Sequence, residues 1–441
     1  MPKLKKDLSL FGLVMIVVGS VIGSGIFLTP SQIAGHLTTP TSIMLIWCFG
    51  GFIALTGALT YGELGGMFPK TGGVYVYLKE AYGDFIAFMY GWAYFTVIMS
   101  GTVAALAIAF SSYMGYLFEM TMFEKSMLAV IVVIIVSVIN IFRVKLVEMF
   151  TNTFSIMKLL GIALIIIIGL FFGTYETLTI KETVSSSNTE SNFITAFGLA
   201  LIGVLWSFGG WHHASFLSGE AKNANKNIPR AMIIGTTLVL LVYLLTNAAY
   251  MFLLTTTEMA QSESLASEAL SKIIPVGGIV IAIIILISTF GTALVGSLTG
   301  PRLYLAMAND GLFFKKLSEI HPKSNTPVNA IIAQGVWAII ILLLWGTFEA
   351  VITYVVFIDW IFFFLTALIV LIFRVKRKDA IRPYKTPLYP VTPIIFIITS
   401  FLFVINTLVG NILYAGAGLI LLALGSPFYF YFKYEKLKSN A

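Results

Sequence analysis

The sequence repeats one feature along its whole length, an apolar stretch long enough to cross a lipid bilayer. Hydrophobic residues make up 58% of the 441 residues and charged residues only 11%, whereas a soluble chain carries about 25% charged residues. Twelve stretches reach the length that a bilayer requires, at roughly 10–35, 41–69, 83–112, 127–145, 148–172, 194–219, 229–254, 275–307, 328–346, 348–374, 391–411 and 412–432. Since backbone groups in lipid must be hydrogen-bonded internally, the sequence predicts an all-α polytopic membrane protein with twelve transmembrane helices.

Basic residues are distributed unevenly between the loops that join these stretches. If the N-terminus is cytoplasmic, 23 of the 27 Lys and Arg residues fall on the cytoplasmic side. Only Lys125, Lys181 and Lys272 fall outside, and Lys158 falls within a stretch. The positive-inside rule therefore predicts a multi-pass protein of the plasma (inner) membrane with both termini cytoplasmic. The net charge of +7 is explained by this asymmetry, so no nucleic-acid partner is expected.

Glycine interrupts two of the twelve stretches at mid-depth. Gly23 and Gly25 lie in "VIGSGIF" of the first stretch, and Gly209 and Gly210 lie in "LWSFGGWHH" of the sixth. Paired glycine-interrupted spans in corresponding positions indicate a binding site between two inverted repeats. If the first ten helices are two repeats of five, the discontinuous helices 1 and 6 occupy corresponding positions of a 5+5 inverted repeat, followed by two additional helices; the family resemblance described below implies this architecture. The alternative is that small residues only allow helices to pack closely.

An interrupted helix exposes backbone groups of both polarities. Free amides at a helix start favour an anion, and free carbonyls favour a cation. Two facing interruptions are therefore suited to a zwitterion, the part that all α-amino acids share. The amides expected to bind the carboxylate are those of Gly23, Ser24 and Gly25, together with the Ser24 hydroxyl. The carbonyls expected to bind the ammonium are those near Val21, Trp206, Ser207 and Gly209.

Four motifs in order resemble those of a known family. They are "VVGSVIGSGIFLTP", "YGELGGMFPKTGGVYVYLKEAYG", "SFGGWHHASFLSGEAKNANKNIPRAM" and "GPRLYLAMANDGLFFKKLSEIHPKSNTPVNA". Over residues 8 to 390 the chain resembles the amino acid–polyamine–organocation superfamily, its L-type amino acid transporter family, and the bacterial alanine–serine–cysteine exchangers. The resemblance implies sodium-independent exchange of small neutral amino acids without a cofactor. It also implies one transporter domain over 1–441, with repeats at about 10–172 and 194–374 and helices 11 and 12 at about 391–432.

Lys158 is the one basic residue predicted at membrane depth. An intramembrane charge needs a partner, so a functional role is expected. We expect its ammonium to cap carbonyls freed at the first interruption, with hydroxyls such as those of Ser288 or Thr289. The resemblance implies that a lysine here replaces a sodium ion, and that Tyr243 bonds Lys158 or the substrate region. The alternatives are a lysine that reaches the membrane interface and a tyrosine that only packs in the core.

Other residues near the second interruption carry weaker predictions. The resemblance matches Trp206 to an aromatic gate, although an aromatic side chain in a buried helix is often simply packed. His212 is a candidate hydrogen-bond partner of the substrate or of the first helix. Asp359, within the tenth stretch, must be protonated or paired if buried, and we expect a gating or proton-related role without a nameable partner. Glu63 and Glu220 are expected in ion pairs near cytoplasmic helix ends.

Several other classes of protein fit the sequence poorly. It lacks the phosphate-binding, zinc-protease and EF-hand patterns, and no metal site or enzyme activity is expected. A serine protease built on Ser24 and His212 leaves the second interruption unexplained. The single cysteine, Cys48, lies within a predicted helix, so no disulfide-linked ancillary subunit is expected. A proton-coupled amino acid or polyamine permease and a non-transporting amino acid sensor remain as alternative functions.

Overall fold

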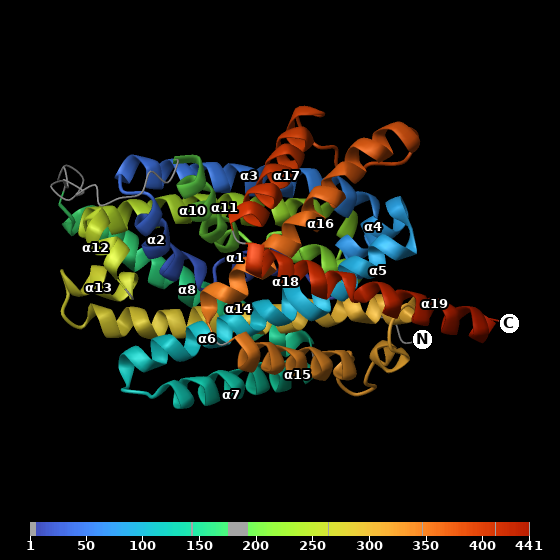
Figure 1. Ribbon diagram of the computed structural model, residues 1–441, viewed down its shortest axis with the longest axis horizontal. Helices are drawn as coiled ribbons and strands as arrows, with labels where there is room; N and C mark the ends of the chain where they lie inside the picture. Colours follow the sequence, from blue (N-terminus) through green and yellow to red (C-terminus); the bar gives the residue numbers. More distant parts are fainter. Residues whose placement is uncertain are drawn as a thin grey trace.

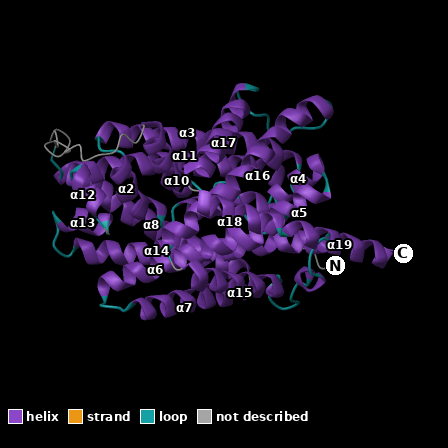
Figure 2. Ribbon diagram, viewed as in Figure 1, coloured by secondary structure: helices purple, strands orange, loops and turns teal. Residues whose placement is uncertain are grey.

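A computed structural model describes residues 6–142, 144–174, 193–262, 264–345, 347–410 and 412–440. These residues form helices joined by turns and loops, and no strand occurs among them (Figure 2). In chain order the helices are α1 (Leu10–Val21), α2 (Gly25–His36), α3 (Pro40–Met67), α4 (Val74–Tyr82), α5 (Asp84–Ala93), η1 (Tyr94–Ile98), α6 (Met99–Leu117), α7 (Met122–Ile141), α8 (Val144–Phe172), α10 (Phe193–Ser207), η2 (His213–Glu220), α11 (Ala224–Leu253), α12 (Thr256–Gln261), α13 (Leu265–Ser271), α14 (Gly277–Asn309), η3 (Lys315–Ser318), α15 (Val328–Trp345), α16 (Phe348–Lys376), α17 (Val391–Gly410), α18 (Ile412–Ala423) and α19 (Gly425–Asn440). The predicted all-α class is confirmed.

Ten helical segments in the described part of the chain are long and apolar enough to cross a membrane. Two further apolar helices, over Ala196–Ser207 and Val328–Leu344, are shorter. The first is short because the sixth predicted stretch is cut by a turn after Ser207. Spans such as α3 and α11, and α14 and α7, run side by side along the longest axis of the molecule (Figure 1), as expected of a polytopic membrane protein.

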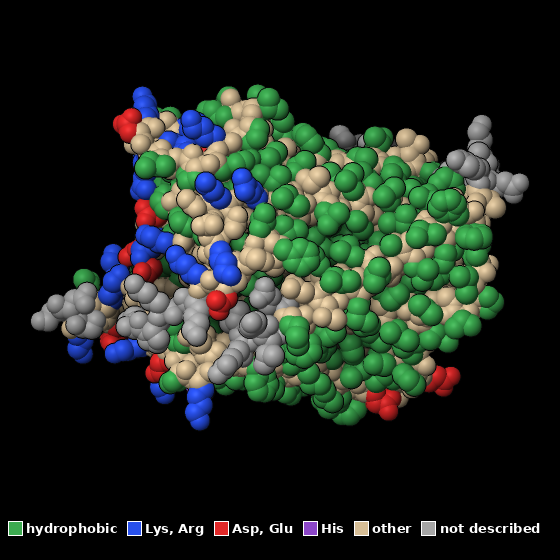
Figure 3. All heavy atoms as spheres, turned by 180° about the vertical axis from the view of Figure 1, so that it is seen from behind, with side chains coloured by type: hydrophobic (Ala, Val, Ile, Leu, Met, Phe, Trp, Pro, Cys, Tyr) green, Lys and Arg blue, Asp and Glu red, His purple; other side chains and the backbone are tan. Residues whose placement is uncertain are grey.

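Apolar and basic side chains occupy different parts of the surface along the longest axis of the molecule. Hydrophobic side chains cover the middle of the molecule, and Lys and Arg side chains gather at the end where α19 lies (Figure 3). Both described ends of the chain lie at this end of the molecule. Lys6, near the N-terminal end, lines one cleft together with Lys79. Lys79 and Lys436, which is near the C-terminal end, both contact Asp84. An apolar belt is favourable against lipid and costly against water, so the surface fits a membrane protein.

The few basic residues predicted outside lie at the other end where the structure describes them. Lys272 pairs with Glu258 at 2.6 Å beside α12 and α13, which lie opposite the α19 end (Figure 1). Lys125 lines a cleft at the same end, together with Ser262. Lys3, Lys5, Arg143 and Lys181, which also entered the prediction of orientation, lie outside the described residues.

The interrupted first span lies in the centre of the bundle. Leu10–His36 is the most enclosed of the ten candidate spans, whereas Met122–Ile141 is among the least enclosed. α1 packs against α11, α8 and α14, and α2 packs against α10. The first two helical segments therefore join the two halves of the chain at the core of the molecule.

Candidate functional site

The first interruption lies between α1 and α2, where Ile22–Ser24 leave the helical path. The amides of Gly23, Ser24 and Gly25 have no acceptor among the described residues, as expected at a helix start, whose first amides lack intrahelical partners. The Ser24 hydroxyl is buried and likewise unpaired within the described chain. The start of α2 therefore presents several free donors, and the helix dipole favours negative charge there.

The second interruption lies between α10 and η2. α10 ends at Ser207, residues 208–212 form a turn, and the chain resumes as the 3₁₀ helix η2. Gly210 adopts φ +100°, a conformation that glycine reaches without a steric penalty. The predicted helical stretch over 194–219 is therefore two helices of different kinds, separated by a turn.

The two interruptions touch each other. A Cβ atom added to Gly25 would lie 2.6 Å from Cα of Ser207, and one added to Gly210 would lie 2.6 Å from Oγ of Ser20. Both distances are far below van der Waals contact, so only glycine fits at either position. Ser20 also hydrogen-bonds Nδ1 of His213, the first residue of η2. The two broken helices thus meet through close backbone contacts.

A cavity of about 60 Å³ lies where they meet. Its lining includes six of the residues predicted to bind substrate, Val21, Gly23, Ser24, Gly25, Trp206 and Gly209. The remaining walls come from η1, α6, α14 and α16, including the side chains of Thr102, Thr292 and Asp359. Residues with free donors and an unpaired hydroxyl therefore line this cavity.

Three of the carbonyls predicted to bind an ammonium already accept hydrogen bonds. The Tyr243 hydroxyl lies 2.9 Å from the Val21 carbonyl and 3.1 Å from the Ser207 carbonyl, and the Gly209 amide donates to the Trp206 carbonyl at 2.9 Å. Each carbonyl oxygen has two lone pairs and can accept a second bond. Ser207 does not line the cavity, and its hydroxyl bonds Thr29 at 2.8 Å.

Lys158 of α8 is buried against the first interruption. Its ammonium donates to the Gly19 carbonyl at 2.8 Å, to the Ile22 carbonyl and to the Thr292 hydroxyl at 3.0 Å. Three partners match the three donors of an ammonium. The side chain therefore caps carbonyls that the unwound segment leaves free, and it does not extend to the membrane interface.

The hydroxyls that share this capping role come from α14. Ser288 lies 3.3 Å from the Ile22 carbonyl and 3.2 Å from the Gly23 carbonyl. Of the two hydroxyls offered as alternatives, Ser288 therefore makes these contacts, whereas Thr289 donates to carbonyls of its own helix. Thr292 takes its place because residues four apart lie on the same face of a helix.

The two histidines occupy different environments. His213 lines the cavity and bonds Ser20. His212 does not line it; its ring packs among aromatic side chains such as Trp211 and Phe363, and neither ring nitrogen has a hydrogen-bond partner among the described residues. His213, and not the predicted His212, therefore lies at the cavity. No cluster of three His, Cys, Asp or Glu side chains that could hold a metal occurs in the described chain.

Trp206 lines the cavity, and its ring contacts a residue that lines a cleft at the α12–α13 end. Its ring meets that of Phe348 edge to face, with ring centroids 5.9 Å apart. Trp206 lines the cavity, and Phe348 lines the cleft that also contains Lys125. The aromatic pair therefore joins the wall of the cavity to the wall of that cleft.

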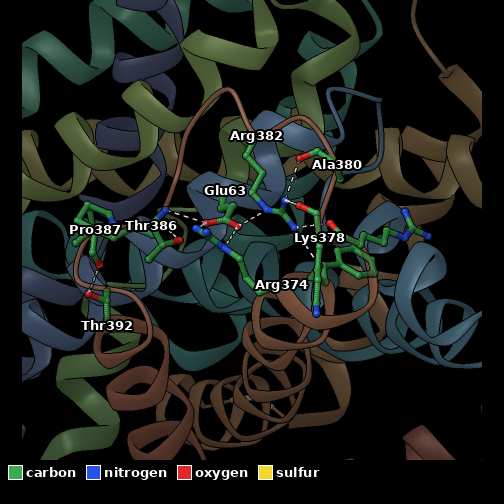
Figure 4. Close-up of polar contacts among 11 residues, drawn as sticks. Glu63, Arg374, Lys378, Ala380, Arg382, Thr386, Pro387 and Thr392 are labelled. Carbon is green, nitrogen blue, oxygen red and sulfur yellow. Dashed lines mark hydrogen bonds and ion pairs between the residues drawn. The ribbon is translucent and has the colours of Figure 1, made fainter.

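Buried ion pairs lie toward the α19 end of the molecule. Glu63 of α3 accepts hydrogen bonds from Arg374 at 2.7 Å and 2.8 Å, from Arg382 at 3.1 Å and from the Thr386 amide at 2.8 Å (Figure 4). These bonds tie α3 to α16 and to the segment that follows it. Glu220, at the end of η2, pairs with Arg302 of α14 at 3.0 Å. The predicted ion pairs of both glutamates are confirmed.

Comparison with known proteins agrees with this arrangement. Residues 8–425 match the amino acid permease family. The serine/threonine exchanger SteT of Bacillus subtilis (strain 168) is 33% identical over 98% of both chains. The b(0,+)-type amino acid transporter 1 of Mus musculus is 31% identical over 98% of this chain and 89% of its own.

A human protein is similar to the same degree. The large neutral amino acids transporter small subunit 2 of Homo sapiens is 31% identical over 97% of this chain and 80% of its own. The chain belongs to the amino acid permease family. It is a transporter of the amino acid–polyamine–organocation superfamily and not an enzyme.

Proposed function

We propose that this permease is a sodium-independent antiporter that exchanges small neutral L-amino acids, such as alanine, serine, cysteine and glycine, by alternating access. The observation that carries the proposal is the cavity where two interrupted helices meet, with the free amides of Gly23, Ser24 and Gly25 in its wall. The names of three relatives describe amino acid transport or exchange. Alternating access requires that the cavity open to one side at a time.

The two ends of an amino acid find different partners in this cavity. Its carboxylate binds the amides at the start of α2 and the Ser24 hydroxyl, which otherwise lacks a partner within the described chain. Its ammonium lies near the carbonyls of Val21 and Gly209. We propose that Trp206 acts as the gate, which is supported by the contact of its ring with Phe348 of the cleft at the α12–α13 end.

Lys158 supports sodium independence. Its ammonium binds the Gly19 and Ile22 carbonyls, which together with hydroxyls form the kind of oxygen cluster that a cation prefers. A tethered cation thus fills the place that a dissolved cation would otherwise take. Exchange is expected to proceed equally well in sodium and in choline buffers.

The architecture that we infer has twelve spans. The segments from α1 to α8 form the first five-helix repeat and those from α10 to α16 the second, inverted repeat, with α17 and the α18–α19 pair as additional helices. We infer that both termini lie in the cytoplasm of a cell bounded by the plasma (inner) membrane, which is supported by the Lys and Arg side chains that gather at the α19 end. Cys48, the one cysteine, lies within α3, so the chain works without a disulfide-linked ancillary subunit.

Counterflow in proteoliposomes tests the proposal. Purified protein is reconstituted with unlabelled alanine inside, and uptake of labelled alanine is followed with and without internal substrate, with sodium or choline, and with or without a pH gradient. An antiporter takes up label only when substrate is inside, whatever the cation. Uptake driven by a pH gradient into empty vesicles supports the alternative of a proton-coupled permease. Specific binding without any uptake supports the alternative of a membrane sensor.

A further inference from the structure

One basic side chain at the α12–α13 end has no role in the function described above. Lys125, near the start of α7, lines the cleft at that end, which we call the outer cleft. Its side chain forms no ion pair with the residues that the structure describes, although it is partly buried. Lys272, at the same end, instead pairs with Glu258 at 2.6 Å. Within the described chain the ammonium of Lys125 therefore lacks a counter-charge.

Two carboxylates at this end of the molecule are held by other partners. Glu124, the neighbour of Lys125 in sequence, accepts hydrogen bonds from the Thr121 amide at 2.7 Å and from the Thr121 hydroxyl at 2.8 Å. Glu268 accepts one from the Ser264 hydroxyl at 3.2 Å. Both carboxylates bind at the starts of their own helices, a usual place for an acidic side chain. Neither of them neutralises Lys125.

The side chain of Lys125 is held against the wall of the outer cleft. A Cβ atom added to Gly115 of α6 would collide with Cε of Lys125 and would lie 3.1 Å from its Nζ. Gly115 lines the same cleft. Because residue 115 has no side chain, the stem of the lysine can lie along α6. The ammonium is thus kept at the wall of the outer cleft.

The outer cleft is larger than the cavity and lies beside it. Its volume is about 680 Å³, and its wall includes the polar side chains of Ser31, Gln32 and Ser112. The hydroxyls of Ser31 and Ser112 donate to backbone carbonyls, and their oxygens can still accept a bond. Phe348 also lines the outer cleft and contacts Trp206 of the cavity wall. The outer cleft thus offers a cation and several acceptors next to the cavity.

We propose that the outer cleft is a capture site, in which Lys125 binds the carboxylate of an amino acid before the substrate reaches the cavity. The inference rests on the proposed function, because it assumes that the cavity transports amino acids and that the α12–α13 end faces the outside. The capture site is separate from the amides of Gly23–Gly25 and serves only substrate that arrives from outside. An exposed ion pair is weak and is screened by salt, so the captured substrate can move on to the cavity.

Transport measured from each side of the membrane tests the capture site. Right-side-out and inside-out membrane vesicles are preloaded with alanine, and the KM for labelled alanine is measured from the side that faces the medium. In Lys125→Gln we expect this KM to rise about threefold in right-side-out vesicles, the effect of losing an exposed ion pair, and to stay unchanged in inside-out vesicles. Added salt should raise the KM of the unmodified protein toward that of Lys125→Gln, because it screens the pair. Lys125→Arg is the matched control, since it keeps the charge and should keep the KM.

Chemical replacement of the charge separates an electrostatic role from a structural one. Lys125→Cys is combined with Cys48→Ser, which removes the one cysteine of the chain. Aminoethyl methanethiosulfonate then attaches an ammonium to the new thiol through a disulfide, and the outer KM should return to nearly that of Cys48→Ser alone. Sulfonatoethyl methanethiosulfonate attaches a sulfonate to the same sulfur, and the outer KM should rise above that of Lys125→Gln.

The inference is overturned by an outer KM that is the same in Lys125→Gln and in the unmodified protein. It is also overturned by a KM that rises equally from both sides, because such a change lies in the transport cycle and not in capture from outside. Equal effects of the two reagents would likewise contradict it, because the charge would then play no part. Failure of the proposed function has a different signature, since the unmodified protein would then exchange no alanine from either side.

Discussion

Gly25 is the position at which the smallest change should have the largest effect. In Gly25→Ala the added Cβ atom lies 2.6 Å from Cα of Ser207, whereas ordinary contact begins at 3.4 Å. The two broken helices must therefore separate by about 0.8 Å at the point where they touch, in an interior that is close-packed. Overpacking typically costs about 1–3 kcal/mol. We expect a cost near the upper end, because backbone atoms of Ser207 cannot move aside by a change of rotamer.

The same displacement moves the amides that are proposed to hold the carboxylate. A loss of about 1.4 kcal/mol in binding corresponds to tenfold weaker affinity, so Gly25→Ala should lose at least that factor. Affinity for alanine is measured by competition in counterflow, and stability by the temperature at which the monodisperse peak is lost in detergent.

Gly35→Ala is the matched control, since it lies in the same helix and its added Cβ atom meets nothing within 4 Å. Alanine is favoured over glycine within a helix, so this variant should keep its affinity and be at least as stable as the unmodified protein. If Gly25→Ala binds alanine as tightly and melts at the same temperature as Gly35→Ala, the two interruptions do not touch as described and the reasoning fails.

Three further substitutions test the surroundings of the cavity. Lys158→Met removes the ammonium that caps the first interruption. Because hydrogen bonds to a charged group are worth about 1.5–3 kcal/mol each, alanine counterflow should be lost when it is compared at equal amounts of folded protein. Counterflow at the wild-type rate would contradict the role assigned to Lys158. Tyr243→Phe keeps the ring contacts with Trp47 and Phe208 but removes the hydroxyl. The free energy of unfolding should fall by about 1 kcal/mol, which is measured as a lower melting temperature. An unchanged melting temperature would argue against the hydrogen bonds of the Tyr243 hydroxyl. Glu63→Gln leaves its arginine partners without a counter-charge. Because breaking a buried ion pair costs about 3–5 kcal/mol, the melting temperature should be markedly lower. A variant with an unchanged melting temperature would show that the ion-pair cluster does not stabilise the protein.

Sequence reasoning was effective where one local rule decides the structure. Apolar length identified the helical class and most spans. Glycine at mid-depth identified both interruptions, and a charge at membrane depth identified Lys158 as a residue that needs partners. Each of these features depends on the residue itself and its nearest neighbours in sequence.

The remaining features of the site could not be predicted, because they depend on the irregular backbone of the interruptions and on contacts between distant helices. The turn at Gly210 changes the chain direction and η2 is a 3₁₀ helix, so helical spacing could not show that His213, and not His212, faces the cavity. The hydroxyl of Tyr243 reaches the Val21 carbonyl from a helix far along the chain, which no local pattern reveals. Thr292 was within reach of sequence reasoning, since it is four residues from Ser288 on the same face.

Free backbone groups at the two interruptions are proposed to recognise both ends of an amino acid. Competition against labelled alanine tests this recognition with two analogues, alaninamide, which lacks the carboxylate, and lactate, which lacks the ammonium. The arrangement predicts that neither analogue inhibits at concentrations at which alanine saturates the carrier. Inhibition by alaninamide equal to that of alanine would show that the amides of Gly23–Gly25 do not bind a carboxylate, and equal inhibition by lactate would show that the carbonyls do not bind an ammonium.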